Sequence, residues 1–350
     1  MKIGIITIND YDNYGNRLQN YAVQEIIKKI GHTPITLPNA SRANTKEKYF
    51  IRKIRSIFDK KYSKNHTRAK NFKSFNQLIS FSKHTFDAYH HKEYCDYYVV
   101  GSDQVWNPYI DRCRELDLLT FAPKDRRIAL AASFSVNAIP NGKKTLLKTE
   151  LPKFKAISVR EERGKEIIQE LGIKQKVTVL SDPTFILSDT EWAKVTKKPL
   201  NIEVPKKYIL LYFLGEISDS RLRKIKHYAK QNNCAIINIL DPTDHFYGSG
   251  PSEFLYLEKN ASLICTDSFH SSVFGIIFQR PFIVFDREQN GVVSMNTRIE
   301  TLLKKYKLEN HKYSGKLLIC NNSADDYSKT KKIIVREQQL FLDFIRENIV

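Results

Sequence analysis

Short apolar runs alternate with segments of helical periodicity along this chain. The first run, 2–8, is rich in β-branched residues and is typical of a buried strand. From Asn16 apolar side chains recur every three or four positions until Gly31, which predicts a helix, and 34–37 predicts the next strand. Further strands are predicted at 97–100, 127–132, 155–160, 177–180, 208–214, 234–240, 263–266 and 282–285. Strands that alternate with helices indicate an α/β fold.

The chain is long enough for two such domains. Its 350 residues exceed what one hydrophobic core usually holds. Residues 188–206 are rich in Lys, Pro, Thr and Asp and are typical of a domain boundary. We therefore predict an N-terminal domain at 1–195, which includes a basic segment at 42–73, and a C-terminal domain at 205–325. A helical pattern at 330–350 would allow a last helix to pack back on the first domain.

Polar side chains follow several of the predicted strands. Because α/β sheets bind ligands beyond the carboxyl ends of their strands, these side chains are candidate ligand contacts. The amides Asn13, Asn16 and Gln19 are placed to read sugar hydroxyls, although Asn and Gly also simply form turns. The loop that holds them is not G-x-G-x-x-G, so no dinucleotide site is predicted.

Two charged residues lie at other predicted strand ends. Asp103 follows the strand 97–100, where it either contacts a ligand or caps the next turn. Arg160 ends the strand 155–160, and an arginine in such a place forms a good fork for a carboxylate or phosphate. The alternative for Arg160 is an ion pair with Glu161 or Glu162.

The stretch 265–272, Cys-Thr-Asp-Ser-Phe-His-Ser-Ser, has the pattern of a strand, a polar turn and the start of a helix. The first N–H groups and the positive dipole end of a helix favour an anion. His270 lies in this turn, with Ser268, Phe269 and Ser271 beside it as candidate contacts for an anionic ligand. Serine and aspartate also cap helices, so a capped helix with a structural histidine is the alternative.

The formal net charge of +19 predicts anionic partners. Between Arg42 and Lys73 twelve Lys and Arg residues stand against Glu47 and Asp59, a local net charge of +10. Apolar residues at 50–58 form one stripe within this segment, which favours either a basic helix on an anionic membrane or a helix packed on the protein with a solvated basic face. Nucleic acid is not expected as a partner, because the chain carries no recognised binding motif.

The cysteine pattern and the chain start bear on the compartment. The five cysteines are scattered without a C-x-x-C pair, so we expect neither a disulfide framework nor a metal site. The first residues lack a signal-peptide pattern, and no apolar run reaches the length of a membrane span. These features predict a cytoplasmic protein, with peripheral contact at the inner face of the membrane as an option for the basic segment.

Six blocks of the sequence together resemble the polysaccharide pyruvyl transferase family. They are N-Y-G-N with L-Q at 13–19, G-S-D-Q-V-W-N at 101–107, S-V-R-E at 158–161, S-D-P at 181–183, T-D-S-F-H at 266–270 and M-N-T-R at 295–298. The resemblance implies two Rossmann-like domains facing a cleft, as in GT-B glycosyltransferases, with an acceptor side and a donor side. It also implies transfer of pyruvate from phosphoenolpyruvate to a sugar, usually as a cyclic ketal, without a cofactor.

The same resemblance places Asp103, Arg160 and His270 at the active site. The enol carbon must gain a proton, for which His270 is the candidate acid; Arg160 would compensate donor charge, and Asp103 would orient or deprotonate the sugar hydroxyl. Several branches of the family have an arginine where this chain has Ser268, and Arg298 is our choice for the replacement.

The expected role is the assembly of a capsule or exopolysaccharide, with a sugar or a lipid-linked oligosaccharide as acceptor. Two alternatives remain at this point: a glycosyltransferase that uses a nucleotide sugar, and a non-catalytic glycan-binding module.

Overall fold

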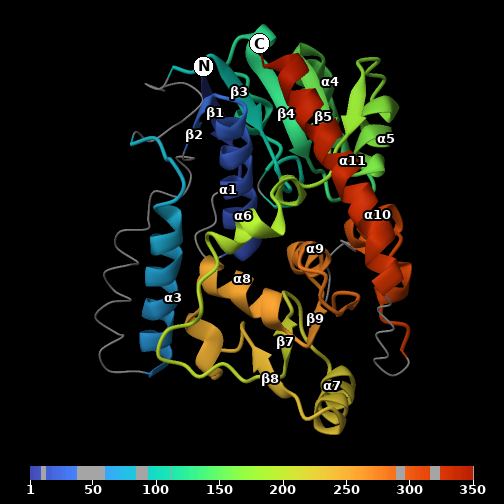
Figure 1. Cartoon of the computed structure of the whole chain (residues 1–350). Coiled ribbons are helices and arrows are strands. Elements are labelled where there is room, and N and C mark those ends of the chain that lie inside the picture. The colour runs from blue at the N-terminus through green and yellow to red at the C-terminus, as the bar shows by residue number, and fades with distance from the viewer. Residues whose placement is uncertain are drawn as a thin grey trace. The chain divides into compact units, whose positions relative to one another are not determined.

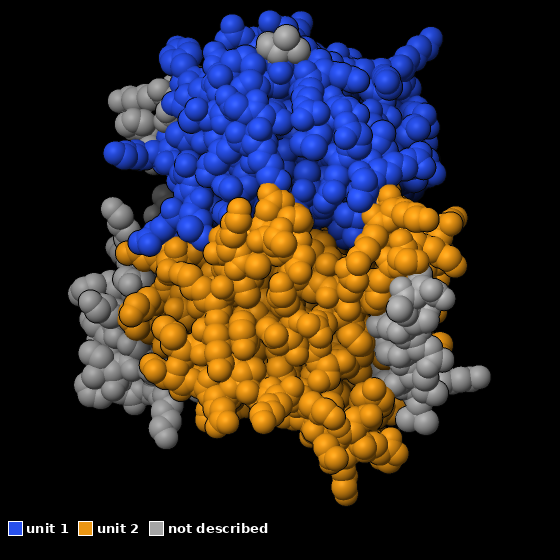
Figure 2. Space-filling model, in the orientation of Figure 1, with its two compact units in different colours: residues 1–43, 76–187, 334–350 blue, residues 44–75, 188–333 orange. Residues whose placement is uncertain are grey.

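Two parallel sheets organise the chain, one in each of two structural units. The computed structural model describes residues 1–8, 13–37, 60–83, 94–110, 112–288, 296–315 and 324–349. Unit 1 comprises Met1–Ala43, Asn76–Leu187 and Ile334–Val350; unit 2 comprises Asn44–Phe75 and Ser188–Ile333 (Figure 2). Each unit has a Rossmann-like arrangement of parallel strands joined by helices, which confirms the predicted α/β class.

Unit 1 is built on a six-stranded sheet in the order β2-β1-β3-β4-β5-β6 (Figure 1). Its strands are β1 Lys2–Ile6, β2 Thr33–Thr36, β3 Tyr97–Val100, β4 Arg127–Ala132, β5 Ala156–Val159 and β6 Val177–Val179. Its α-helices include α1 Tyr14–Lys29, α4 Asn141–Glu150 and α5 Glu162–Glu170. Because β2 and β3 lie on opposite sides of β1, the sheet has a topological switch point between β1 and β3, where α/β folds bind ligands.

The inner strands β3, β4 and β5 of unit 1 are buried almost throughout, because their residues are mostly apolar on both faces. All six residues of β4 are buried, as parallel strands covered on both sides require. Trp106 packs at 5.2 Å from the Phe134 ring and at 6.0 Å from the Phe154 ring, and its indole N–H donates to the Asp117 carbonyl at 2.9 Å. This core fixes the loop that begins at Asp103.

Unit 2 repeats the same topology on a smaller scale. Its sheet has the order β10-β9-β7-β8, with β7 Tyr208–Tyr212, β8 Ala235–Asn238, β9 Leu263–Thr266 and β10 Phe282–Val284. Its α-helices include α6 Asp189–Ala193, α7 Asp219–Gln231, α8 Pro251–Asn260, α9 Phe269–Ile277 and α10 Asn296–Tyr306. The switch point here lies between β7 and β9, so the predicted turn at 266–270 falls at one of the two ligand-binding positions of the fold.

Helix α3, Lys60–Asn76, differs from the domain assignment made from the sequence. We placed 42–73 in the N-terminal domain, but α3 lies almost entirely in unit 2, because its side chains bond to the loop before α8. Asn71 Nδ2 donates to the Gly248 carbonyl at 2.9 Å, and the Arg68 guanidinium donates to the Tyr247 carbonyl and lies over that ring. The apolar stripe at 50–58 falls outside the described residues.

The last helix, α11 Ala324–Asn348, contributes to both units along its length. Its part from Ile334 onward belongs to unit 1, where Ser181 Oγ donates to Glu337 at 2.7 Å and Gln338 Nε2 donates to the Phe185 carbonyl at 2.8 Å. The boundary between the units along the chain lies at Leu187–Ser188, at the start of the predicted boundary segment.

Candidate functional site

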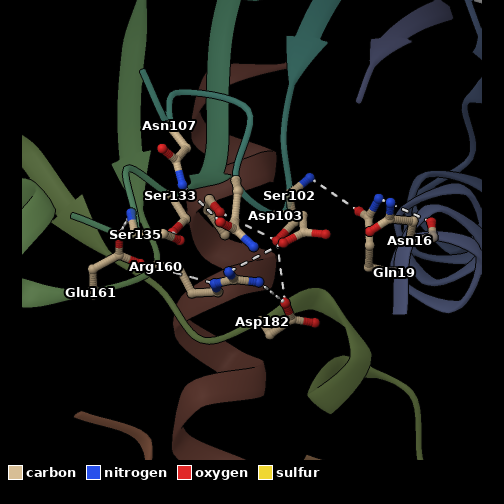
Figure 3. A network of polar contacts seen from close by, with 12 residues as sticks. Asn16, Gln19, Ser102, Asp103, Asn107, Ser133, Ser135, Arg160, Glu161 and Asp182 are labelled. Carbon is tan, nitrogen blue, oxygen red and sulfur yellow. Dashed lines mark hydrogen bonds and ion pairs between the residues drawn. The ribbon is translucent and has the colours of Figure 1, made fainter. Parts of the chain in front are cut away.

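Gln19 joins the two strand ends at the switch point of unit 1. Its side-chain N–H group donates to Thr7 Oγ1 at 2.8 Å and to the Asn16 carbonyl at 3.2 Å, and its oxygen accepts from the Ser102 N–H at 3.2 Å (Figure 3). Thr7 Oγ1 donates in turn to the Ser102 carbonyl at 3.1 Å. The predicted sugar contact Gln19 is therefore engaged by the protein, where it holds the ends of β1 and β3 together.

Asn13 and Asn16 shape the start of α1. The Asn13 side chain caps the helix by accepting from the Asn16 N–H at 3.1 Å. Asn16 is buried in the first turn, close to Gln19 (Figure 3). Asn13 thus has the structural role of capping the turn, which was the alternative to a sugar contact. Asn16 remains a candidate contact for a sugar hydroxyl.

Asp103 occupies a strained backbone position directly after β3. Its φ of 74° lies in the left-handed region, and its carbonyl accepts from the N–H groups of Val105 at 2.8 Å and Ser133 at 3.0 Å. The preceding Gly101 has φ 124°, and a Cβ there would lie 2.2 Å from the Leu130 carbonyl oxygen. Only glycine fits so close to β4, which explains the glycine of the G-S-D block.

Arg160 lies at the centre of a buried carboxylate cluster. Its guanidinium donates to Asp182 at 2.7 Å and to Asp103 at 3.5 Å, and its Nε lies 4.0 Å from Glu161 (Figure 3). Ser102 Oγ donates to the same Asp182 oxygen at 3.3 Å. The structure thus brings the predicted residues Asp103 and Arg160 together in unit 1, and adds Asp182 as the strongest partner of the arginine.

Three carboxylates act on the charge of the Arg160 guanidinium. Burial by itself would lower the pKa of Arg160, but the ion pairs with Asp182, Asp103 and Glu161 outweigh burial and raise that pKa. Three carboxylates thus lie around one guanidinium, and the arginine stays protonated. We infer that the guanidinium orients carboxylates, whereas the sequence alone suggested a fork for a substrate anion.

Glu161 connects the cluster to the loop after β4. Its Oε1 accepts from Ser133 Oγ at 2.8 Å, from the Phe134 N–H at 3.0 Å and from the Ser135 N–H at 3.2 Å. Glu161 was weighed as a partner of Arg160, but Asp182 was not. The sequence did contain an indication of Asp182, because this residue follows a predicted strand just as Asp103 does.

In unit 2, Asp267 joins the strand ends at the switch point between β7 and β9. Its carboxylate accepts from the Leu214 N–H at 2.7 Å, from the Gly215 N–H at 2.8 Å and from Arg287 Nε at 3.1 Å. Thr266 Oγ1 accepts from the Ser268 N–H at 2.9 Å and donates to the Tyr212 carbonyl. The turn before α9 is therefore held from several sides.

His270 lies in the first turn of α9 and is 8 % exposed. Its ring meets the Phe269 ring edge to face at 5.4 Å, and the guanidinium carbon of Arg298, from α10, lies 5.8 Å from the centre of the Phe269 ring. Ser268 precedes α9 but makes no side-chain capping bond. Unit 2 thus brings together four predicted residues, His270, Ser268, Phe269 and Arg298.

Ser271 points away from this group and into the protein. It is fully buried, and its hydroxyl lies 2.5 Å from Glu258 Oε1 on α8. Ser271, which the sequence predicts as a substrate contact, is thus engaged by the protein in this structure. A helix turns by about 100° per residue, so consecutive side chains lie on different faces. No motif surrounds Glu258 in the sequence, so its contact with Ser271 was not predicted.

Two negative observations concern only the residues that the structure describes. Within these ranges no group of three or more His, Cys, Asp or Glu side chains is placed to hold a metal ion. None of the helices described has the length and apolar character that crossing a membrane requires.

Several solved structures are similar to this chain in their backbone trace. UDP-GlcNAc 2-epimerase from Methanocaldococcus jannaschii is 14 % identical with a TM-score of 0.49, and the match covers 96 % of this chain and 92 % of that one. A glycosyltransferase from Rickettsia africae is 14 % identical with a TM-score of 0.46, covering 99 % and 96 %. UDP-N-acetylglucosamine 2-epimerase from Rickettsia bellii is 10 % identical with a TM-score of 0.42, covering 99 % and 98 %.

Comparison with curated protein sequences found no match. The model of the family described as polysaccharide pyruvyl transferase matches residues 13–289, which span both switch points, the Asp103–Arg160 cluster and His270. The chain therefore belongs to the polysaccharide pyruvyl transferase family.

Proposed function

We propose that this protein transfers pyruvate from phosphoenolpyruvate to a sugar of a surface polysaccharide precursor and forms a cyclic ketal. The observation that carries the proposal is the family match over 13–289, which contains every residue assigned a catalytic role here. The pairing of Asp103 with Arg160 in unit 1 and the position of His270 at the start of α9 in unit 2 support it.

The reaction needs one proton and two sugar hydroxyls. Protonation of C3 of phosphoenolpyruvate turns the methylene into a methyl group and leaves C2 as an oxocarbenium-like electrophile. One hydroxyl adds to C2 and loses its proton, which replaces the proton given to C3. The bond between C2 and the phosphate oxygen then breaks, and the second hydroxyl adds to C2 and loses its proton to the departing phosphate. The products are the ketal and inorganic phosphate.

Asp103 is the proposed base for the attacking hydroxyl. A carboxylate accepts a hydroxyl proton best when it is ionised and fixed in direction. Arg160 fixes the direction of the carboxylate, since its hydrogen bond at 3.5 Å orients one oxygen. In this proposal Arg160 is a positioning residue, and Asp182 in turn positions Arg160.

His270 is the proposed acid for C3. Imidazolium is the side chain best suited to donate a proton near neutral pH. The positive end of the α9 dipole and the Arg298 guanidinium beside Phe269 would attract the carboxylate and phosphate of the donor. Arg298 is therefore the proposed replacement for the arginine that other branches carry at the position of Ser268. Arg287 is a weaker choice because Asp267 already holds it.

Transfer in deuterium oxide tests the proposal. The purified protein is incubated with phosphoenolpyruvate and sugar or lipid-diphosphate-linked sugar acceptors, and phosphate release and the product's NMR spectrum are recorded. The expected product is a ketal whose methyl group carries one solvent deuterium, because C3 gains one hydron. Release of a nucleotide from a nucleotide sugar, without a deuterated methyl group, would show a glycosyltransferase in its place.

His270→Ala should lower kcat by about 10²–10⁴-fold, the usual contribution of a positioned acid, while the far-UV circular dichroism stays unchanged. His227→Ala, at an exposed position on α7, is the matched control and should leave kcat unchanged. Full activity of the His270 variant would assign the proton donation to another group.

A further inference from the structure

Glu258 is a fully buried carboxyl group that the proposed chemistry does not use. It lies on α8 with 0 % exposure, and its Oε1 is 2.5 Å from Ser271 Oγ. Its Oε2 is buried and has no hydrogen-bond partner among the described residues, and no ion pair within those ranges involves Glu258. Ser271 follows His270 directly in α9.

A carboxylate in this place would be a bare buried charge. Ionised carboxyl groups are buried only where cations or several hydrogen-bond donors compensate them, and the Ser271 hydroxyl is one neutral donor. Burial accordingly raises the pKa of Glu258 well above its ordinary value, and the Ser271 hydrogen bond lowers it only in part. The group is therefore a neutral acid over a range of pH in which an exposed glutamate is ionised.

The other titratable groups nearby do not supply the missing charge. Tyr208, on β7, donates its hydroxyl to the Leu257 carbonyl at 2.8 Å. The pKa of this phenol is raised, first by burial and then by Tyr256 and Glu258, whereas Arg280 lowers it. Each of these groups acts on Tyr208, whereas burial and Ser271 alone dominate at Glu258. From α9, the group that meets Glu258 is the Ser271 hydroxyl, which does not titrate.

We propose that Glu258 is a positioning residue: as a neutral acid it accepts the Ser271 hydrogen bond and so clamps the first turn of α9, which carries His270. Ionisation would destabilise this packing of α8 on α9, because the charge would be buried without a cation beside it. On the other side of His270, Asp267 fixes the turn to β7. The histidine is thus held from both sides along the chain. The link to proton donation rests on the proposed function, whereas the clamp itself does not.

Unfolding as a function of pH tests the protonation state without substrate. The pKa of Glu258 is higher in the folded than in the unfolded chain, so its stabilising contribution is complete below the unfolded value of about 4.3 and is lost as the pH rises towards the folded value. Relative to Glu258→Gln, which does not titrate, the folding equilibrium constant of the wild type should fall about tenfold per pH unit in that window. Parallel curves for the two proteins would overturn the proposal.

Hydrogen exchange of the α9 amides at one neutral pH tests the clamp. Ser271→Ala and Glu258→Ala should speed exchange of this segment by about tenfold, since they remove the tie to α8, and Glu258→Gln should retain protection. Glu253→Gln is the matched control on α8, because that side chain bonds to the Gly250 N–H at the other end of the helix and should leave α9 unchanged. Unchanged exchange in both alanine variants would overturn the proposal.

Kinetics then test the link to catalysis. Glu258→Ala should lower kcat about tenfold with a smaller change in KM, Glu258→Gln should rescue it, and kcat of the wild type should fall more steeply at alkaline pH than kcat of the glutamine variant. If the wild type transfers no pyruvate, the proposed function fails, while the unfolding and exchange measurements still decide the clamp. If transfer occurs but all variants share one pH profile, the positioning role fails.

Discussion

At the residue scale, Arg160 and Asp182 organise the candidate site of unit 1 through their hydrogen bonds to other side chains. The arginine aligns Asp103, and Asp182 anchors the arginine at 2.7 Å while its second oxygen accepts from the Thr184 N–H and hydroxyl. Since all these atoms are buried, the geometry of Asp103 depends on charge balance within the cluster rather than on solvent.

Replacing Asp182 by Asn should destabilise the protein by about 2–3 kcal/mol, because the amide can keep the Thr184 bonds but turns an N–H group towards the Arg160 guanidinium. We also expect kcat to fall about tenfold as Asp103 loses its alignment. Urea unfolding and steady-state kinetics measure the two effects. Asp125→Asn, at an exposed position of unit 1, is the control and should change neither. Wild-type values for the Asp182 variant would contradict the role assigned to the cluster.

At the scale of elements, each sheet uses one side chain to tie the two strands at its switch point. Gln19 links the ends of β1 and β3 in unit 1, and Asp267 links the ends of β7 and β9 in unit 2. Strand ends at a switch point diverge and leave backbone N–H groups without ladder partners, so a polar side chain must satisfy them. The candidate residues Asp103 and His270 follow these tied ends closely.

Asp267→Asn should destabilise unit 2 by about 2–3 kcal/mol, since its carboxylate serves two backbone N–H groups and Arg287, and an amide offers only one acceptor oxygen. Activity should fall with stability, because α9 starts two residues later. Asp219→Asn, exposed in the first turn of α7, should cost less than about 1 kcal/mol. Thermal and urea unfolding measure the stability of both variants. Equal losses of stability would argue against the role of Asp267 in linking β7 to β9.

At the scale of the whole molecule, the net charge of +19 is the feature that the proposed chemistry does not require. Part of the basic segment is structural, because Arg68 is buried between the Phe72 and Tyr247 rings. Lys70 and Lys73 on the same helix are exposed. An acceptor carried on a lipid diphosphate would place the enzyme at an anionic surface, to which exposed lysines are attracted.

Sedimentation with anionic lipid vesicles at low salt tests this attraction. Lys70→Gln with Lys73→Gln should weaken binding about tenfold or more, at about 1 kcal/mol for each lysine near the surface. Lys226→Gln with Lys230→Gln removes the same charge from α7 and should weaken binding less. Equal losses in the two double variants would show that only the overall charge matters, and absence of binding would remove the membrane from the proposal.

Much of the fold was predictable because it is encoded locally. All ten predicted strands are present, with ends that differ by at most two residues, and the helix after the turn at 266–270 was expected from its pattern. Asp103, Arg160 and His270 are predicted as site residues because they follow strands and lie in blocks typical of the family. The segment 42–73 was assigned to the other domain because its contacts with the loop before α8 lie more than 170 residues away.

The sequence by itself determined the two parallel sheets, the polar strand ends and the family, since apolar periodicity and short motifs act between neighbours in the chain. Only the tertiary structure decided which polar groups meet. The order β2-β1-β3 brings Gln19 to Ser102, 83 residues apart, and β5 beside β6 brings Arg160 to Asp182. Packing of α9 on α8 hides Ser271 against Glu258. Side-chain pairing and burial depend on sheet order and helix packing, which no local pattern contains.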